Sequence, residues 1–565
     1  MVSPMPDVAR TPSAAAYHRQ LELIAEMSHE FANSRDLGNT LQYGLEQVVA
    51  FVGAEAASLF LIDQRTSELV CRACVGPVNI TGLRLAAGQG VVGQAVAQNR
   101  TVFVKDAGKD PYFAAKVDAK TGFATRSILC APLSLRDQCL GAIELLNKAG
   151  GDVFHSGDRQ VLRALGASAA LAISNARLTA AMVEQERMRR EVELAAEIQR
   201  GMLPNRLPAG FPVQGINRPA YAVSGDFFDI VPLPGERVAF AIGDVSGKGI
   251  NASLLMAKTI SLFHCLAKTH ARPGPLLAAI NQELCETAGS GGTFVTMVAG
   301  LLDRRTGSVL LANAGHEPPL LRRGGAFVAF EAASPPLGIA PELVPESLAE
   351  HWIELAGDAL YLFTDGLTES LSEDAMATDA MVGAEGVGRL IDEAAALPAE
   401  DRLRAILDRL CADGAALRDD LTLLVVEDQR PRPLLAQRLL ACPDCLCRLR
   451  LQVREAALAA GCRPEAAEEV VLAVDEACQN VIRHAYGGDG EIVLEIRRDP
   501  PGALEVQLID FAPPIDPDRV APRPLDDLRP GGLGTHFIRS VMDEVSFLPP
   551  PPGAGNFLRL SKAIP

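Results

Sequence analysis

The sequence has few of the features that mark secreted, membrane or nucleic-acid-binding proteins. Its 12 cysteines in 565 residues are too sparse for a disulfide framework. No apolar run reaches the roughly 18 residues of a membrane span, and the first ten residues lack the basic and apolar segments of a signal peptide. The formal net charge of −17 has the wrong sign for a nucleic-acid backbone or an anionic membrane. We therefore expect a cytoplasmic protein that has no membrane span and no nucleic-acid partner.

The composition is that of a folded chain with several domains. Hydrophobic residues make up 48% and charged residues 22%, and roughly 150 residues per domain predicts three to four domains. Prolines at 204, 208 and 212, and again at 431 and 433, indicate linkers. We predict an N-terminal tail (1–19), a first domain (20–175), a helical linker (176–203), a second domain (204–428) and a third domain (429–565).

Hydrophobic periodicity predicts a multidomain α+β protein. The first domain is expected to contain helices over 15–35, 41–52 and 159–178, with strands over 57–62, 102–104, 127–133 and 139–146. The second is rich in strands (238–242, 296–302, 308–312, 359–363 and 421–426), with helices near 252–269 and 275–288. The third should have helices over 444–460, 464–484 and 534–542, and strands over 492–496 and 504–509.

The segment from Leu178 to Arg200 contains no Gly or Pro, and its apolar residues recur at heptad spacing. Gln185 and Gln199 occupy two positions of the apolar seam. Two interpretations stay open. The segment is either a short coiled coil in which these glutamines set the register, or a single helix that packs on a neighbouring domain.

Four aspartates stand at the ends of strand-like runs, at Asp226, Asp244, Asp365 and Asp419. A carboxylate beside buried strands must be paired or metal-bound, and no Lys or Arg recurs beside all four. If the strands bring these groups together, their oxygen ligands favour Mg²⁺ or Mn²⁺, and two such ions can lower the pKa of a bridging water. The alternative is that each Asp forms a turn at the end of its strand.

The ordered motifs AAEIQRGMLP, SGDFFD, GDVSGKG, GTFVTM, NAGHEPP, FTDGLTE and RDDLTLLVV, over residues 195–427, resemble the PPM (type 2C, metal-dependent) serine/threonine phosphatases, in their bacterial stress-response and sporulation branch. The resemblance implies an α-β-β-α sandwich with two Mn²⁺ or Mg²⁺ ions. It implies that the catalytic metal ligands are Asp226, Asp244, Asp365, Asp419 and the carbonyl of Val245. Many relatives have Gly at the position of Val245, but a carbonyl ligand does not depend on the side chain. For His316 we favour a loop-bracing role over general acid catalysis.

A second set of motifs lies near the C-terminus. Glu476 and Asn480 are four residues apart and share a helix face, a strand ends at Asp510, and glycines at 531, 532 and 534 precede a helix, where backbone N–H groups favour phosphate. Over about residues 435–562 these features resemble the GHKL ATP-binding α/β sandwich of anti-sigma-factor serine kinases. The resemblance implies bound ATP with Mg²⁺, with these roles: Glu476 as general base, Asn480 as Mg²⁺ ligand, Asp510 as the adenine-reading carboxylate, and Gly532 and Gly534 in the phosphate loop. This chain has Ala512 where the family commonly has Gly, which leaves nucleotide affinity and kinase activity open.

Residues 20–175 resemble a GAF sensor domain, chiefly through GQGVVGQAVAQNRTVFVKD. Asn147, Lys148, Phe154 and Asp158 also match a pattern of cyclic-nucleotide-binding GAF domains, but Arg159 replaces the expected Glu. We therefore expect another small ligand, or dimerisation, rather than a cyclic nucleotide.

Two cysteine groups remain, Cys71-x-x-Cys74 and Cys442-x-x-Cys445-x-Cys447. Structural zinc normally needs four ligands, and neither group has an obvious partner pair. We interpret these cysteines as buried or incidental thiols.

Taken together, the resemblances imply a homodimeric bacterial signalling enzyme. Under GAF control it would remove phosphate from Ser or Thr of a STAS-type anti-sigma-factor antagonist, and a fused serine kinase domain would add it. In the alternative, the third domain is a non-catalytic module that binds a sigma factor or the antagonist. A histidine-kinase-like sensor is disfavoured because the segment Leu178–Met202 contains no His.

Overall fold

The computed structural model describes residues 18, 19, 21, 22, 25–27, 29, 30, 37–113, 115–136, 138–204, 207, 208, 210–287, 292–344, 347–370, 382–411, 417–499, 502–516 and 534–564. The chain divides into two compact units, residues 1–189 and 190–565. The predicted tail over 1–19 and helix over 15–35 lie largely outside the described residues; those described within 18–30 are helical. None of the described helices combines the length and the apolar character that crossing a membrane requires.

The first unit is built on an antiparallel sheet of six strands in the order β3-β2-β1-β6-β5-β4. Leu45 of helix α2, Leu145 of β6 and Leu162 of helix α5 share the core on one face, while Val92 of helix α3 packs with Phe60 on the other. The strands are β1 (Ala54–Ile62), β2 (Leu69–Val75), β3 (Arg84–Leu85), β4 (Val102–Val104), β5 (Ile128–Leu135) and β6 (Gln138–Lys148), and the helices are α2 (Leu37–Val52), α3 (Gly90–Gln98), α4 (Ala115–Thr121) and the start of α5 (Ser156–Met202).

Helix α5 joins the two helical segments predicted over 159–178 and 178–200 into one helix of 47 residues. Within the second unit its last turns pack on the middle domain, where Ala196 and Gln199 are buried. Gln185 is exposed. The end of the helix therefore packs on a domain, and Gln199 is bonded within that contact as described below.

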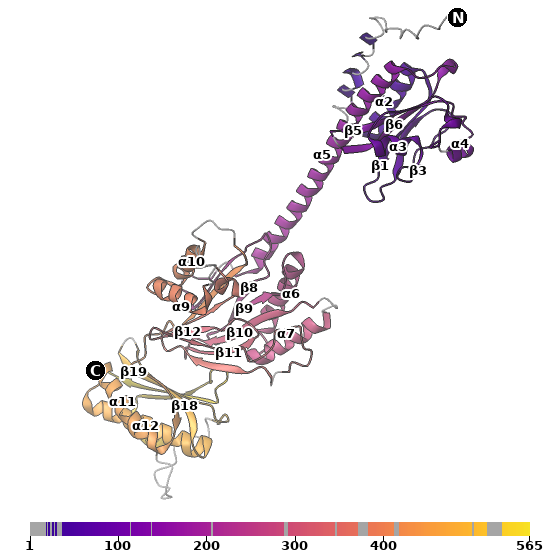
Figure 1. The fold of residues 1–565 in the computed structure, drawn as a ribbon. Helices are drawn as coiled ribbons and strands as arrows, with labels where there is room; N and C mark the ends of the chain where they lie inside the picture. The colour runs from indigo at the N-terminus through magenta and orange to yellow at the C-terminus, as the bar shows by residue number, and fades with distance from the viewer. Residues whose placement is uncertain are drawn as a thin grey trace, which may run out of the picture. The chain divides into compact units, whose positions relative to one another are not determined.

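The middle domain consists of two face-to-face sheets between two pairs of helices (Figure 1). Phe240, Val298 and Leu424 are fully buried in the core between the sheets. Helices α6 and α7 cover the first sheet, and α9 and α10 cover the second, which confirms the α-β-β-α sandwich. The first sheet is β14 (Glu350–Glu354), β11 (Ser308–Ala314), β10 (Val295–Asp303), β9 (Arg237–Val245) and β8 (Phe227–Leu233); the second is β13 (Ala326–Ala329), β12 (Leu320–Arg323), β15 (Ala359–Phe363), β16 (Leu421–Glu427) and β7 (Val213–Arg218); the helices are α6 (Ile250–Leu266), α7 (Pro273–Thr287), α8 (Asp365–Thr368), α9 (Gly383–Ala394) and α10 (Ala399–Leu410).

The C-terminal domain is a five-stranded antiparallel sheet with helices on one face (Figure 1). Side chains alternate between faces along a strand, so β18 directs Ile492, Leu494 and Ile496 toward the helices and Glu495 and Arg497 to the opposite face. The sheet order is β17 (Leu435–Ala441), β18 (Gly490–Asp499), β19 (Ala503–Asp510), β21 (Asn556–Ala563) and β20 (Glu544–Leu548); the helices are α11 (Pro443–Ala460), α12 (Pro464–Asn480), the π-helical turn η5 (Val481–Tyr486) and α13 (Gly534–Val541).

The second face of this sheet packs against the middle domain through buried charges. Arg430 binds Asp428 and Glu495, at 2.9 and 3.2 Å, and Arg497 binds Asp428 at 3.0 Å. These arginines and carboxylates satisfy one another where an unpaired charge would be costly.

Candidate functional site

The four predicted aspartates lie at one end of the two sheets of the middle domain. Asp226 directly precedes β8, and Asp244 is near the end of the neighbouring antiparallel strand β9. In the second sheet, Asp365 follows β15 and Asp419 precedes β16, which also pair antiparallel. The end of one antiparallel strand lies beside the start of its neighbour, so each sheet contributes two carboxylates to the same edge.

Hydrogen bonds between the sheets join these two edges. Asp226 is 2% exposed, and its Oδ2 accepts bonds from Thr364 Oγ1 at 2.6 Å and Thr422 Oγ1 at 2.7 Å. Thr364 directly precedes Asp365, and Thr422 lies in β16 of the second sheet. The bonds fix the Asp226 carboxylate against the opposite sheet.

The carboxylates influence one another electrostatically. Burial, followed by the nearby charge of Asp365, raises the pKa of Asp244 to about 6. Burial and the charge of Asp244 also raise the pKa of Asp226, and burial, Glu369 and then Asp419 raise that of Asp365. Proximity of like charges disfavours ionisation, so the site gains from any bound cation.

Lys248 brings a positive charge to this cluster. Lys248 Nζ lies 2.9 Å from Asp419 Oδ2 and donates to the Arg418 carbonyl at 3.1 Å. Lys248 is exposed. It neutralises one edge of the cluster only.

The donors fit hard divalent cations. A side chain at Gly225 would come within 3.1 Å of the Val245 carbonyl oxygen and 3.3 Å of Asp244 Oδ1, so both oxygens border the same space. Carboxylate and carbonyl oxygens suit Mg²⁺ or Mn²⁺. Among the described residues, no three His, Cys, Asp or Glu side chains are grouped so that they could hold one metal ion. Metal binding would therefore depend on pairs of carboxylates, the Val245 carbonyl and water.

Sequence reasoning missed two residues that position this site. Asp420 is 7% exposed and accepts bonds from the amides of Ala220 and Gly225 and from Ser224 Oγ, at 2.7 to 2.9 Å. Asp419 and Asp420 are adjacent in the same motif. Nothing in the sequence shows that Asp420 is the one that binds the loop over residues 220–225.

Gln199 of helix α5 is the other positioning residue. Its carboxamide donates to the Ser224 carbonyl at 2.6 Å and accepts from the Ser224 amide at 2.9 Å. Ser224 is two residues before Asp226, so the last turns of the helix are bonded to the loop that carries a candidate ligand.

His316 is a bracing residue in this geometry. It is 5% exposed, its Nδ1 lies 2.8 Å from Thr296 Oγ1, and its amide donates to Asn313 Oδ1 at 2.9 Å. Burial lowers its pKa to about 4. The His316 imidazole is therefore neutral at pH 7 and lacks the second ring proton that an imidazolium would donate as a general acid.

In the C-terminal domain, three residues of the second predicted site lie close together. Glu476 and Asn480 lie on α12 and are partly buried. A Cβ at Gly534 would come 2.5 Å from Glu476 Oε2 and 3.5 Å from Asn480 Nδ2. The start of α13 therefore lies against the predicted base and Mg²⁺ ligand. Gly532 lies outside the described residues.

Asp510 ends β19 and is 3% exposed. Its Oδ1 accepts from Asn556 Nδ2 at 2.8 Å and from the Ala512 amide at 3.0 Å. Ala512 packs tightly on Gly555, where a Cβ would come within 1.8 Å of the Ala512 carbonyl oxygen. This close approach is to the backbone of residue 512, so it requires Gly at 555 whichever side chain stands at 512.

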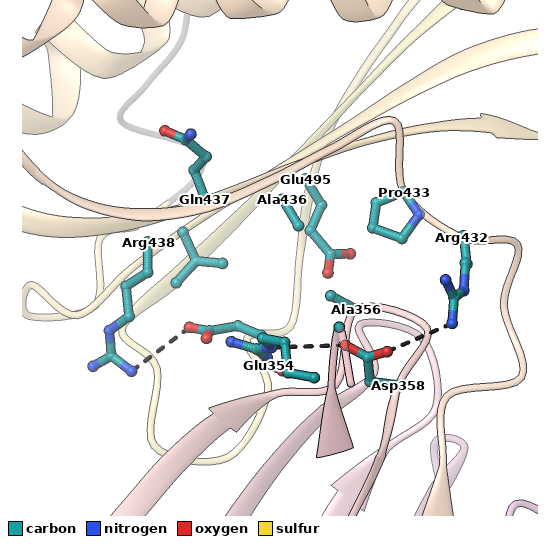
Figure 2. A pocket seen from close by; sticks show the side chains of 12 residues that line it. Glu354, Ala356, Asp358, Arg432, Pro433, Ala436, Gln437, Arg438 and Glu495 are labelled. Carbon is teal, nitrogen blue, oxygen red and sulfur yellow. Dashed lines mark hydrogen bonds and ion pairs between the residues drawn. The ribbon is translucent and has the colours of Figure 1, made fainter. Parts of the chain in front are cut away.

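A cavity of about 530 Å³ lies between β14–β15 of the middle domain and β17–β18 of the C-terminal domain (Figure 2). In it Arg438 pairs with Glu354 at 3.6 Å, and Arg432 pairs with Asp358 at the same distance. None of the candidate catalytic or nucleotide-binding residues lines this cavity.

The GAF-pattern residues brace the connection from β6 to α5. Asn147 is 1% exposed and binds the amides of Arg126 and Ser127 and the carboxylate of Glu55. Lys148 Nζ lies 2.5 Å from Asp158 Oδ2. These contacts give the residues a structural role without a ligand.

Three family models match the chain in sequence order. They are the GAF domain over residues 36–173, Stage II sporulation protein E over 234–428 and the histidine kinase-like ATPase domain over 440–562. The chain thus carries a GAF domain, a PPM-type domain and a GHKL-type domain, as the sequence motifs predicted. Domains of the latter two types generally use divalent metal and ATP, respectively.

Individual relatives cover parts of the chain. Phosphoserine phosphatase RsbU of Bacillus subtilis is 29% identical over 50% of this chain and 82% of its own length. Dual 3',5'-cyclic-AMP and -GMP phosphodiesterase 11A of Takifugu rubripes is 28% identical over 32% of this chain and 22% of its own length. A solved structure of the RsbU and RsbW domains of Rv1364c from Mycobacterium tuberculosis is 24% identical, with a TM-score of 0.32, over 62% of this chain and 94% of that one.

Proposed function

We propose that the middle domain is a metal-dependent phosphatase that removes phosphate from Ser or Thr of a STAS-type anti-sigma-factor antagonist. The observation that carries this proposal is the convergence of Asp226, Asp244 and Asp365 as mutually repelling carboxylates at the adjoining ends of the two sheets. The likeness to a phosphoserine phosphatase supports the reaction. Asp226, Asp244, Asp365, Asp419 and the Val245 carbonyl would hold two Mn²⁺ or Mg²⁺ ions, which supply hydroxide near neutral pH.

The chain's own residues have distinct tasks in this proposal. Thr364 and Thr422 orient Asp226, and Asp420 holds the loop before it. Lys248, exposed beside Asp419, is placed to attract the phosphate dianion. Gln199 bonds the end of α5 to the same loop. Through this helix, a small ligand bound at the GAF domain would control phosphatase activity.

Incubation with a serine-phosphorylated antagonist and Mn²⁺ tests the reaction. Phosphate should be released from the antagonist, and this release should stop when a chelator is added. Release at an unchanged rate in the chelator would remove the basis for a metal-dependent site.

For the C-terminal domain, we infer an ATP-dependent serine kinase that phosphorylates the same antagonist. Glu476 would accept the hydroxyl proton, Asn480 would bind Mg²⁺, Asp510 would read adenine, and Gly532 and Gly534 would contact phosphate. The position of Gly534 against Glu476 supports this arrangement.

The second candidate for this domain is a binding module for a sigma factor or the antagonist. Ala512, where the family commonly has Gly, motivates this alternative. Transfer of labelled phosphate from ATP to the antagonist, absent in Glu476→Ala, would identify a kinase. Tight partner binding without transfer would identify the module.

The sensor, location and assembly complete the proposal. We expect a cytoplasmic homodimer, with an unidentified small ligand at the GAF domain. Sedimentation of the full chain would establish whether it is a dimer.

A further inference from the structure

The connection from β17 to α11 carries two cysteines with adjacent sulfur atoms. β17 ends at Ala441, Cys442 is the N-cap residue of α11, and Cys445 lies in its first turn. The two Sγ atoms are 2.6 Å apart, and the Cys445 amide donates to the Cys442 carbonyl at 3.1 Å. The sulfurs are closer than an ordinary non-bonded contact, so joining them requires only a small local movement.

The setting of this pair favours thiol chemistry. Cys442 directly precedes the first turn of α11, whose first amides have no partner within the helix. Both side chains are partly exposed, so a small reagent can reach them. A Cys-x-x-Cys pair that leads from a strand into a helix is typical of redox-active dithiols.

The same chain contains the same spacing in an unfavourable setting. Cys71 and Cys74 lie in strand β2, and Cys71 is 1% exposed. Burial raises the pKa of the Cys71 thiol to about 12. This thiol is protonated at neutral pH, so Cys71 and Cys74 form an internal control.

Zinc is a poorer occupant of the first pair. Cys447 is exposed, and the part of the chain that the structure describes contains no group of three His, Cys, Asp or Glu side chains placed to hold one ion. Two sulfurs in contact fit a covalent bond better than tetrahedral coordination by four separated ligands.

We propose that Cys442 and Cys445 form a reversible intrachain disulfide by exchange with a low-molecular-weight disulfide. One cysteine thiolate attacks a sulfur of the reagent, which gives a mixed disulfide and releases one small thiolate. The second cysteine then attacks the protein sulfur of the mixed disulfide and releases the other small thiolate. The protein loses two thiol hydrogens, and the reagent is reduced to two thiols that take up both protons.

Differential labelling of the full chain in glutathione mixtures tests this exchange. After acid quenching, free thiols receive one alkylating reagent, and thiols freed by reduction receive a second. The tryptic peptide from Leu439 to Arg448 contains all three cysteines of the group. In oxidised glutathione we expect the second label on Cys442 and Cys445, reversal by dithiothreitol, and the first label on Cys71.

Variants identify the bonded pair. Cys447→Ser should keep the disulfide, whereas Cys442→Ser, which retains a good N-cap residue, and Cys445→Ser should lose it. Three first labels on the wild-type peptide in oxidised glutathione would overturn the proposal. So would an intrachain disulfide that persists in Cys445→Ser, or one zinc ion per purified chain that is lost in Cys442→Ser and in Cys445→Ser.

Discussion

The two candidate sites surround their buried carboxylates with different neighbours. In the middle domain, Asp226 and Asp244 face other carboxylates, and their pKa values are raised by burial and by like charge. In the C-terminal domain, Asp510 is paired with the Asn556 amide and a backbone N–H, and its pKa is raised by burial alone. A cluster of like charges is stabilised when it binds cations. A single carboxylate held in one orientation is suited to accept hydrogen bonds from the polar edge of a base.

The largest effect expected from this difference is on hydrolysis. Asp244→Asn should lower the rate of phosphate release more than about 100-fold, because even residues behind a metal ligand contribute about 10- to 100-fold. The matched control is Asp229→Asn, whose carboxylate is also buried in this domain but pairs with His264 Nδ1 at 2.9 Å. Steady-state rates with Mn²⁺ measure both. Equal losses in the two variants would mean that the effect is on folding and not on the site.

The second effect is on nucleotide binding. Asp510→Asn should weaken ATP binding about 10- to 100-fold, as expected for a lost hydrogen bond to a charged group. Asp475→Asn is the control, because Asp475 lies on the same domain's helix α12 and is paired with Arg450 at 2.7 Å. Calorimetric titration with ATP compares them. Unchanged affinity in Asp510→Asn would remove this carboxylate from the nucleotide site.

A smaller effect is expected where the linker helix meets the aspartate site. Gln199→Ala should lower phosphatase kcat up to about 10-fold, since it frees the Ser224 backbone that precedes Asp226. Gln185→Ala, at an exposed position of the same helix, should have no effect. If both variants retain full activity, the loop is held without the helix.

The smallest effect on activity is expected at His316, where stability should respond instead. Its pKa is lowered to about 4 from the usual 6.5. As the pH falls from 6.5 toward 4, the unfolded chain binds a proton that the folded chain does not, so the stability from neutral His316 is lost in that window. Urea titrations at the two ends of this pH window measure the effect. The free energy of unfolding should fall by up to about 3 kcal/mol more in the wild type than in His316→Gln.

The activity profile provides the complementary check on His316. Between about pH 6 and about pH 9, His316→Gln should keep the shape of the wild-type profile. Loss of the alkaline limb in this variant alone would make His316 a general acid.

Much of the fold follows from local sequence pattern, and the exceptions have physical causes. β4 and β15 have the predicted bounds, because their apolar runs are short and sharply ended. Helix α10 was not predicted, although Leu403, Ile406 and Leu407 recur on one buried face. The edge strands β17 and β20 were also missed, since an edge strand is covered on fewer sides and carries a weaker apolar signal.

The site was predictable in its residues and not in its assembly. Strand-end position singled out Asp226, Asp244, Asp365 and Asp419 as candidates. Antiparallel pairing within each sheet brings two of them together, and the bonds of Thr364 and Thr422 to Asp226 join the two pairs. Asp420 and Gln199 bind backbone atoms of residues 220–225. Such bonds leave no trace in residue type or spacing.

Calorimetric titration of the chelator-treated full chain with Mn²⁺, without ATP, tests most directly whether the strand-end carboxylates hold metal. We expect two ions to bind to the wild type and this binding to be lost in Asp365→Asn. An absence of binding, or the same stoichiometry and affinity in the variant, would contradict it.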